Sequence, residues 1–109
     1  MGREYIIKET SENVWSIMDE NGNIIRVITK DVIINYCKKI FENNHAECMS
    51  AKIVINSVWR NLKYDYNFEF VDNYCQEFDR FLAWFDYTCV EYHSKKVIAF
   101  YKQRLLHFE

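Results

Sequence analysis

The sequence predicts a single α+β domain, residues 1–109, with an N-terminal three-stranded antiparallel meander followed by three to four helices. Two observations predict it. Residues 1–29 contain short β-branched runs separated by polar residues, whereas residues 30–109 repeat apolar residues at helical spacing and contain no proline. Strands followed by helices, rather than alternating with them, are typical of the α+β class. Half of the residues are apolar, so a chain of this length can bury a core.

Three runs are expected to form the meander, at residues 4–9, 13–19 and 24–28. Asn21-Gly22 lies between the second and third runs. Both residues tolerate the positive φ of a type I′ turn, and this pair is the strongest short hairpin signal. The sequence therefore predicts a tight hairpin at this point.

The first helix is expected to begin after Thr29 as N-cap and to end at Asn43-Asn44. Asn44 and Glu47 resemble a capping box, which predicts a second helix from there to about Lys63. The apolar stripe of the first helix is Val32, Ile33, Tyr36, Cys37, Ile40 and Phe41.

The third helix is expected to carry an aromatic seam at heptad spacing. A break is expected within residues 86–95, because Thr88, Val90 and Ser94 weaken helix propensity. Ser94 would then cap a last helix. The seam is Val71, Tyr74, Phe78, Phe81, Phe85, Thr88 and Tyr92; the last helix would bury Val97, Ile98, Tyr101, Leu105 and Phe108.

Four cysteines, Cys37, Cys48, Cys75 and Cys89, fall on the apolar sides of these helices. The N-terminus lacks the apolar run of a secretion signal, and no run is long enough for a membrane span. We therefore expect a cytoplasmic protein with free, buried thiols and no membrane partner.

An acidic segment is the main functional candidate. Between residues 65 and 91 there are seven acids and one base, Arg80, within a chain of net charge −2. Three of these acids are spaced by seven, which predicts one line on the third helix, opposite the aromatic seam. Such a line, beside exposed aromatic rings, is suited to a protein partner with a basic surface. The predicted partner-binding residues are Asp65, Glu69, Asp72, Asp79, Trp84 and Asp86.

Nucleic-acid binding is the alternative. A three-stranded meander followed by a helix, here residues 4–42, is similar in predicted architecture to the small DNA-reading domains of some phage integrases. That resemblance implies contacts from the meander and the first helix, although acids outnumber bases in the meander and DNA binders need several bases on phosphates. The residues concerned are Trp15, Arg26, Lys30, Lys38 and Lys39.

Metal binding and catalysis have weaker signals. His45 and Cys48 are spaced i, i+3, and Cys89 and His93 are spaced i, i+4, so each pair shares a helical face and the four would suit zinc. The usual Cys-x-x-Cys knuckle is absent. Acids near Cys89 would raise its pKa, which disfavours a nucleophile. We therefore expect no metal, no cofactor and no enzymatic activity.

These observations lead to one functional hypothesis. The chain is expected to be a non-enzymatic protein-binding module that uses an acidic, aromatic-rich helical face. Its small size and its Asn-, Ile-, Lys- and Tyr-rich composition are compatible with a phage or mobile-element inhibitor of the anti-defence kind. Self-association through the aromatic helix remains open.

Overall fold

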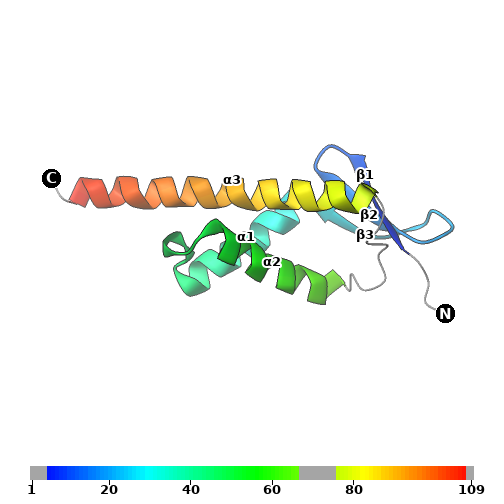
Figure 1. Cartoon of the computed structure of the whole chain (residues 1–109), viewed down its shortest axis with the longest axis horizontal. Helices are drawn as coiled ribbons and strands as arrows, with labels where there is room; N and C mark the ends of the chain where they lie inside the picture. The colour runs from blue at the N-terminus through cyan, green and yellow to red at the C-terminus, as the bar shows by residue number, and fades with distance from the viewer. Residues whose placement is uncertain (1–4, 67–75, 108–109) are drawn as a thin grey trace.

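The computed structural model describes residues 5–66 and 76–107. A three-stranded antiparallel sheet is followed by three α-helices, which confirms the predicted α+β class (Figure 1). The elements are β1 Ile6–Ser11, β2 Val14–Met18, β3 Ile24–Thr29, α1 Lys30–Asn44, the short 3-10 helix η1 Ala46–Cys48, α2 Ala51–Tyr66 and α3 Gln76–His107.

The sheet has the strand order β1-β2-β3, and its inner face supplies one wall of the core. Ile7 is opposite Ile17 across β1 and β2, and Trp15 is opposite Ile28 across β2 and β3. All four side chains are buried. The alternation of side chains along a strand places Ile6 and Val27 on the outer face, where both are exposed.

The hairpin between β2 and β3 is confirmed, but its turn is not the predicted type I′. Of the Asn21-Gly22 pair, only Gly22 has a positive φ, at 81°. The loop instead closes on Asp19, whose Oδ1 accepts hydrogen bonds from the backbone N–H groups of Asn21 and Asn23, both at 2.9 Å. Backbone pairing closes the same loop, since the Asp19 N–H donates to the Asn23 carbonyl at 3.0 Å and the Gly22 N–H donates to the Asp19 carbonyl at 3.1 Å. The connection therefore spans residues 19–23.

Helix α1 begins as the sequence predicts. The Thr29 hydroxyl accepts a hydrogen bond from the Val32 backbone N–H at 3.3 Å, the geometry of an N-cap. Ile33, Cys37 and Phe41 of the predicted stripe are buried.

Helix α2 begins later than predicted. His45 ends α1 in the left-handed conformation, with φ 51°, and residues 46–48 form η1 instead of the first turn of α2. Ser50 is the residue that caps α2, since its Oγ accepts from the Ile53 backbone N–H at 3.3 Å. The predicted Asn44 capping box is therefore wrong, and Cys48 is exposed rather than buried.

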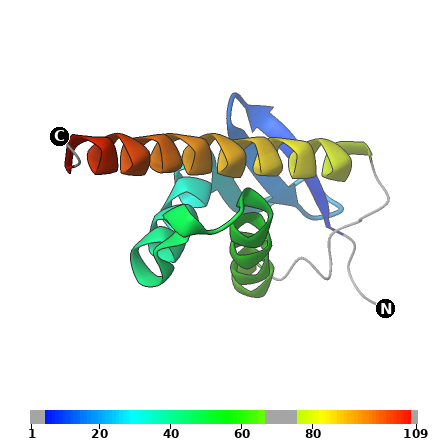
Figure 2. The same cartoon turned by 60° about the vertical axis from the view of Figure 1, so that its left-hand side comes forward.

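Helix α3 is one continuous helix of 32 residues, so the break predicted within residues 86–95 is wrong. Thr88 is tolerated in the buried seam because its hydroxyl donates to the Trp84 carbonyl at 2.8 Å. The helix lies across the sheet and along α1 and α2 (Figures 1 and 2), so tertiary packing outweighs the weak local propensity.

Aromatic rings of α3 form the centre of the core. Phe81 is fully buried, and its ring centroid lies 5.6 Å from Trp15 of β2 and 6.4 Å from Trp59 of α2. Phe78, Phe85 and Thr88 of the predicted seam are also buried, whereas Val71 and Tyr74 lie outside the described residues. One aromatic seam thus joins the sheet to both shorter helices.

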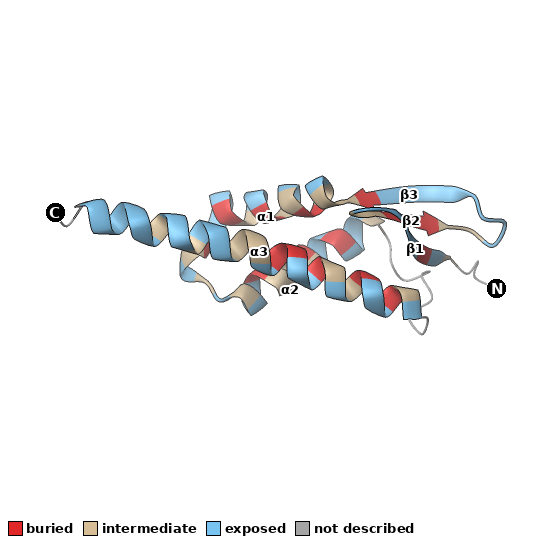
Figure 3. Cartoon of the chain, turned by 90° about the horizontal axis from the view of Figure 1, so that it is seen from above, coloured by how far each residue is buried: buried red, intermediate tan, exposed pale blue. Residues whose placement is uncertain are grey.

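The C-terminal part of α3 extends past α1 and α2, away from the body of the molecule (Figure 3). We call residues 97–107 the arm; its eleven residues extend about 16 Å at the rise of an α-helix. The positions that continue the buried seam after Tyr92 are Lys95, Lys96 and Ala99, which offer no large apolar side chain for packing. The predicted burial of Ile98, Tyr101 and Leu105 is therefore wrong, and all three are exposed; Phe108 lies outside the described residues.

Candidate protein-binding surface on α3

Two carboxylates of the predicted line, Asp79 and Asp86, are exposed on the first half of α3. Their spacing of seven places them on nearly the same line of the helix. The sequence predicted that this line lies opposite the aromatic seam. It lies closer to the seam than that, because Asp86 lines a hollow between α3 and α2. Partial burial there raises the pKa of the Asp86 carboxyl group.

The hollow between α2 and α3 has a volume of about 140 Å³ and mostly apolar walls. Trp59 and Phe85, whose ring centroids are 5.4 Å apart, pack against each other in its wall. The lining residues are Ile55, Asn56, Trp59, Leu82, Phe85 and Asp86. A small apolar pocket with a carboxylate at its rim can hold an apolar side chain beside a positive charge.

Opposite the core, α3 carries an apolar row that we call the outer stripe. Its members lie within an arc of about 80° on the helix, and Tyr87 and Leu105 are five full turns apart on one line. The outer stripe consists of Tyr87, Val90, Ile98, Tyr101 and Leu105, with exposed fractions of 67%, 41%, 54%, 57% and 67%. Large apolar groups gathered on one solvent-facing side mark an interaction surface.

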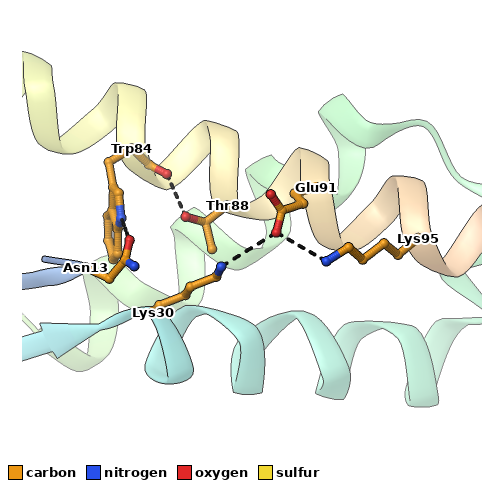
Figure 4. Close-up of polar contacts among 6 residues, drawn as sticks. All are labelled: Asn13, Lys30, Trp84, Thr88, Glu91 and Lys95. Carbon is orange, nitrogen blue, oxygen red and sulfur yellow. Dashed lines mark hydrogen bonds and ion pairs between the residues drawn. The ribbon is translucent and has the colours of Figure 1, made fainter.

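The two halves of α3 have opposite charge. Residues 76–91 contain four carboxylates and one base, Arg80, whereas residues 92–107 contain four bases and no carboxylate. At the boundary, Glu91 Oε1 lies 3.6 Å from Lys30 Nζ and 3.4 Å from Lys95 Nζ (Figure 4). The outer stripe thus runs from an acidic half onto a basic half.

Trp84 is not part of this surface. Its indole N–H donates to Asn13 Oδ1 at 3.1 Å, which attaches α3 to the turn between β1 and β2 (Figure 4). Asp65 is also apart from Asp79 and Asp86, because it accepts a hydrogen bond from the Tyr36 hydroxyl of α1. The predicted residues Glu69 and Asp72 lie outside the described residues.

The residues proposed for nucleic-acid contact are dispersed by the fold. Trp15 is only 2% exposed, so its ring cannot stack on a base. Arg26 lies over the Tyr66 ring, 5.5 Å from its centroid, and Lys30 is paired with Glu91. Lys38 and Lys39 of α1 are exposed.

The four metal-site candidates are not brought together. Buried Cys89 has its Sγ 3.8 Å from that of Cys37, and His93 Nε2 lies 2.8 Å from the Met49 carbonyl oxygen. His45 and Cys48 are exposed. Among residues 5–66 and 76–107, no three His, Cys, Asp or Glu side chains are placed to share an ion.

The burial of the thiols leads to a labelling prediction. In the folded protein, Cys48 is expected to react with iodoacetamide, whereas Cys37 and Cys89 are expected to be protected, because alkylation needs an accessible thiolate. Peptide mass spectrometry after a short labelling pulse would measure each site, and the same pulse in denaturant is the control. Rapid labelling of Cys89 in the folded state would contradict the packing of α3 on α1.

The outer stripe was missed at the sequence level, although a signal for it was present. Tyr87, Val90, Ser94, Ile98, Tyr101 and Leu105 follow one another at steps of three or four, the same periodicity as the buried seam. The break expected near Ser94 divided this pattern, so its second half was assigned to a different, buried face. Only a continuous α3 shows that the row is single and exposed.

Comparisons with models of protein families, with curated proteins and with solved structures found no match. In the two stretches that the structure describes, no helix has both the length and the apolar character that a bilayer crossing requires.

Proposed function

We propose that this chain is a non-enzymatic protein-binding module whose partner carries a basic, apolar segment. The observation that supports the proposal is the arrangement of three features on the acidic half of α3. The carboxylates of Asp79 and Asp86 lie on α3 between the apolar hollow that Asp86 lines and the exposed outer stripe, of which Val90 is the nearest member.

The chemistry of this surface suggests how a partner would bind. An apolar side chain would enter the hollow between Trp59 and Leu82, and a neighbouring Lys or Arg would pair with Asp86. Burial of an apolar anchor supplies most of the affinity, while opposite charges orient the partner and accelerate association. Partial burial raises the pKa of Asp86 because it disfavours the ionised carboxylate. A basic group of the partner beside Asp86 would stabilise that ionised form.

An inhibitory role for a phage or mobile element remains part of the proposal. It is supported by the small size of the chain and by its Asn-, Ile-, Lys- and Tyr-rich composition, which is typical of proteins encoded by A/T-rich genomes. The alternative of DNA binding through the meander has less support, since Trp15 is buried and Lys30 is paired within the chain.

Affinity capture from nuclease-treated lysate of the natural host would test the proposal. The wild type is expected to retain one protein in stoichiometric amount, and the variant Asp79→Lys/Asp86→Lys is expected to lose it. A matched control, Glu9→Lys/Glu12→Lys, makes the same change in net charge at exposed positions of the β1 hairpin.

Thermal unfolding of both variants would verify that the fold is retained. Equal capture by the two charge variants would overturn the proposed surface. Recovery of nucleic acid alone, when nuclease is omitted, would favour the DNA-binding alternative.

A further inference from the structure

We propose that the acidic half of α3 also binds the basic arm of a second copy of this chain, so that two α3 helices pair antiparallel through their outer stripes. This inference rests on the proposed function, because it names one partner for the same acidic surface. The geometry of α3 alone supports it.

The outer stripe has the form that such a pair needs. Helices that associate side by side use apolar residues at steps of three and four, which interdigitate with those of the neighbour. The outer stripe has this spacing from Tyr87 to Val90 and from Ile98 to Leu105, and the small side chain of Ser94 occupies the position between the two parts. The exposure of its members shows that it faces away from the sheet, α1 and α2. Figure 3 shows the exposed arm continuing in line with the docked part of the same helix.

The charges select the antiparallel direction. In a parallel pair, the acidic halves would lie against each other, and so would the basic halves. In an antiparallel pair, each acidic half meets the partner's basic half, which contains Lys102 and Arg104. The chain therefore contains both the acidic surface and a basic, apolar segment of the kind that we propose binds to it.

One ion pair follows from this geometry. Asp86 and Arg104 are eighteen residues apart, which is five full turns, so they lie on one line beside the outer stripe. A twofold axis perpendicular to two antiparallel helices brings the same flank of each helix together, so that the interface is isologous. With the axis near Lys95, Asp86 of each copy faces Arg104 of the other copy, on both sides of the axis.

Light scattering across a concentration series would test the pairing. The wild type is expected to approach twice the chain mass of 13.3 kDa as concentration rises. The variant Ile98→Glu/Leu105→Glu is expected to associate at least about tenfold more weakly, because it places charge in the apolar interface. Both side chains are exposed and lie on the arm, so thermal unfolding of the monomer should not change.

Leu106→Glu is the matched control. Leu106 is on the arm and is 73% exposed, but it is turned about 100° from Leu105, away from the outer stripe. Its substitution is expected to leave association unchanged. Equal disruption by Leu106→Glu, or a wild type that remains monomeric at every concentration, would overturn the inference.

A charge exchange tests the antiparallel direction. Asp86→Arg and Arg104→Glu are each expected to weaken association of the single variant, because each places like charges opposite one another. Mixing the two variants is expected to restore dimers that contain one copy of each, since both contacts then join opposite charges. Failure of the mixture to associate would overturn the antiparallel arrangement.

The pairing and the proposed function can fail separately. A monomeric wild type whose capture of a host protein depends on Asp79 and Asp86 would overturn the pairing and leave the binding function standing. A dimeric wild type whose capture of a host protein does not depend on Asp79 and Asp86 would overturn the proposed binding surface and leave the pairing standing. If both hold, Ile98→Glu/Leu105→Glu should capture more partner, because no second copy then occupies the acidic half.

Discussion

Replacing Phe81 with alanine is expected to lower the free energy of unfolding by about 3–5 kcal/mol, the largest single effect in this chain. Phe81 is fully buried and contacts rings from three elements, including Trp15 of β2 and Trp59 of α2. Removal of its ring would leave a cavity where the sheet, α2 and α3 meet, and these elements cannot all move inward to fill it.

Urea denaturation followed by tryptophan fluorescence and by circular dichroism would measure the loss. Leu106→Ala is the control, because it removes a comparable apolar side chain that is 73% exposed and is expected to change stability by less than about 0.5 kcal/mol. A Phe81→Ala protein as stable as this control would show that α3 does not pack on the sheet as described.

Replacing Val90 with proline is expected to cost about 3 kcal/mol or more, because α3 is continuous at this position. Proline would remove the hydrogen bond from the residue 90 backbone N–H to the Asp86 carbonyl, and its ring would clash with that carbonyl. Val90 is 41% exposed, so little of this cost would come from lost packing.

Val90→Ala separates the backbone effect from the side chain. It removes the same apolar group but improves helix propensity, so the monomer is expected to keep its stability. Thermal melts at low protein concentration would compare the two variants without a contribution from self-association. If Val90→Pro is tolerated as well as Val90→Ala, the helix is broken in this region, as local propensity suggests.

Most of the secondary structure follows from local patterns. The three strands of the meander, the Thr29 cap and the stripe of α1 depend on residues close together in the chain, and each of these predictions is confirmed. Errors occur where two local preferences compete. At residues 44–50, His45 adopts the left-handed conformation and Ser50, rather than Asn44, caps the next helix.

The candidate surface could be predicted only in part. The exposure of Asp79 and Asp86 follows from their spacing on an amphipathic helix. The role of Trp84 does not, because it depends on Asn13, which is seventy-one residues away along the chain. The hollow beside Asp86 likewise exists only because Trp59 of α2 lies against Phe85 of α3.

The sequence by itself determined the α+β class, the order of the elements and the aromatic seam of α3, since these depend on periodicity and caps within short segments. The tertiary structure decided whether α3 is continuous and which of its faces is exposed. Packing against the sheet, α1 and α2 stabilises the helix through Thr88 and Val90, where propensity alone is weak. The same packing covers only one side of α3, and the opposite side, with the arm, therefore carries the outer stripe in solvent.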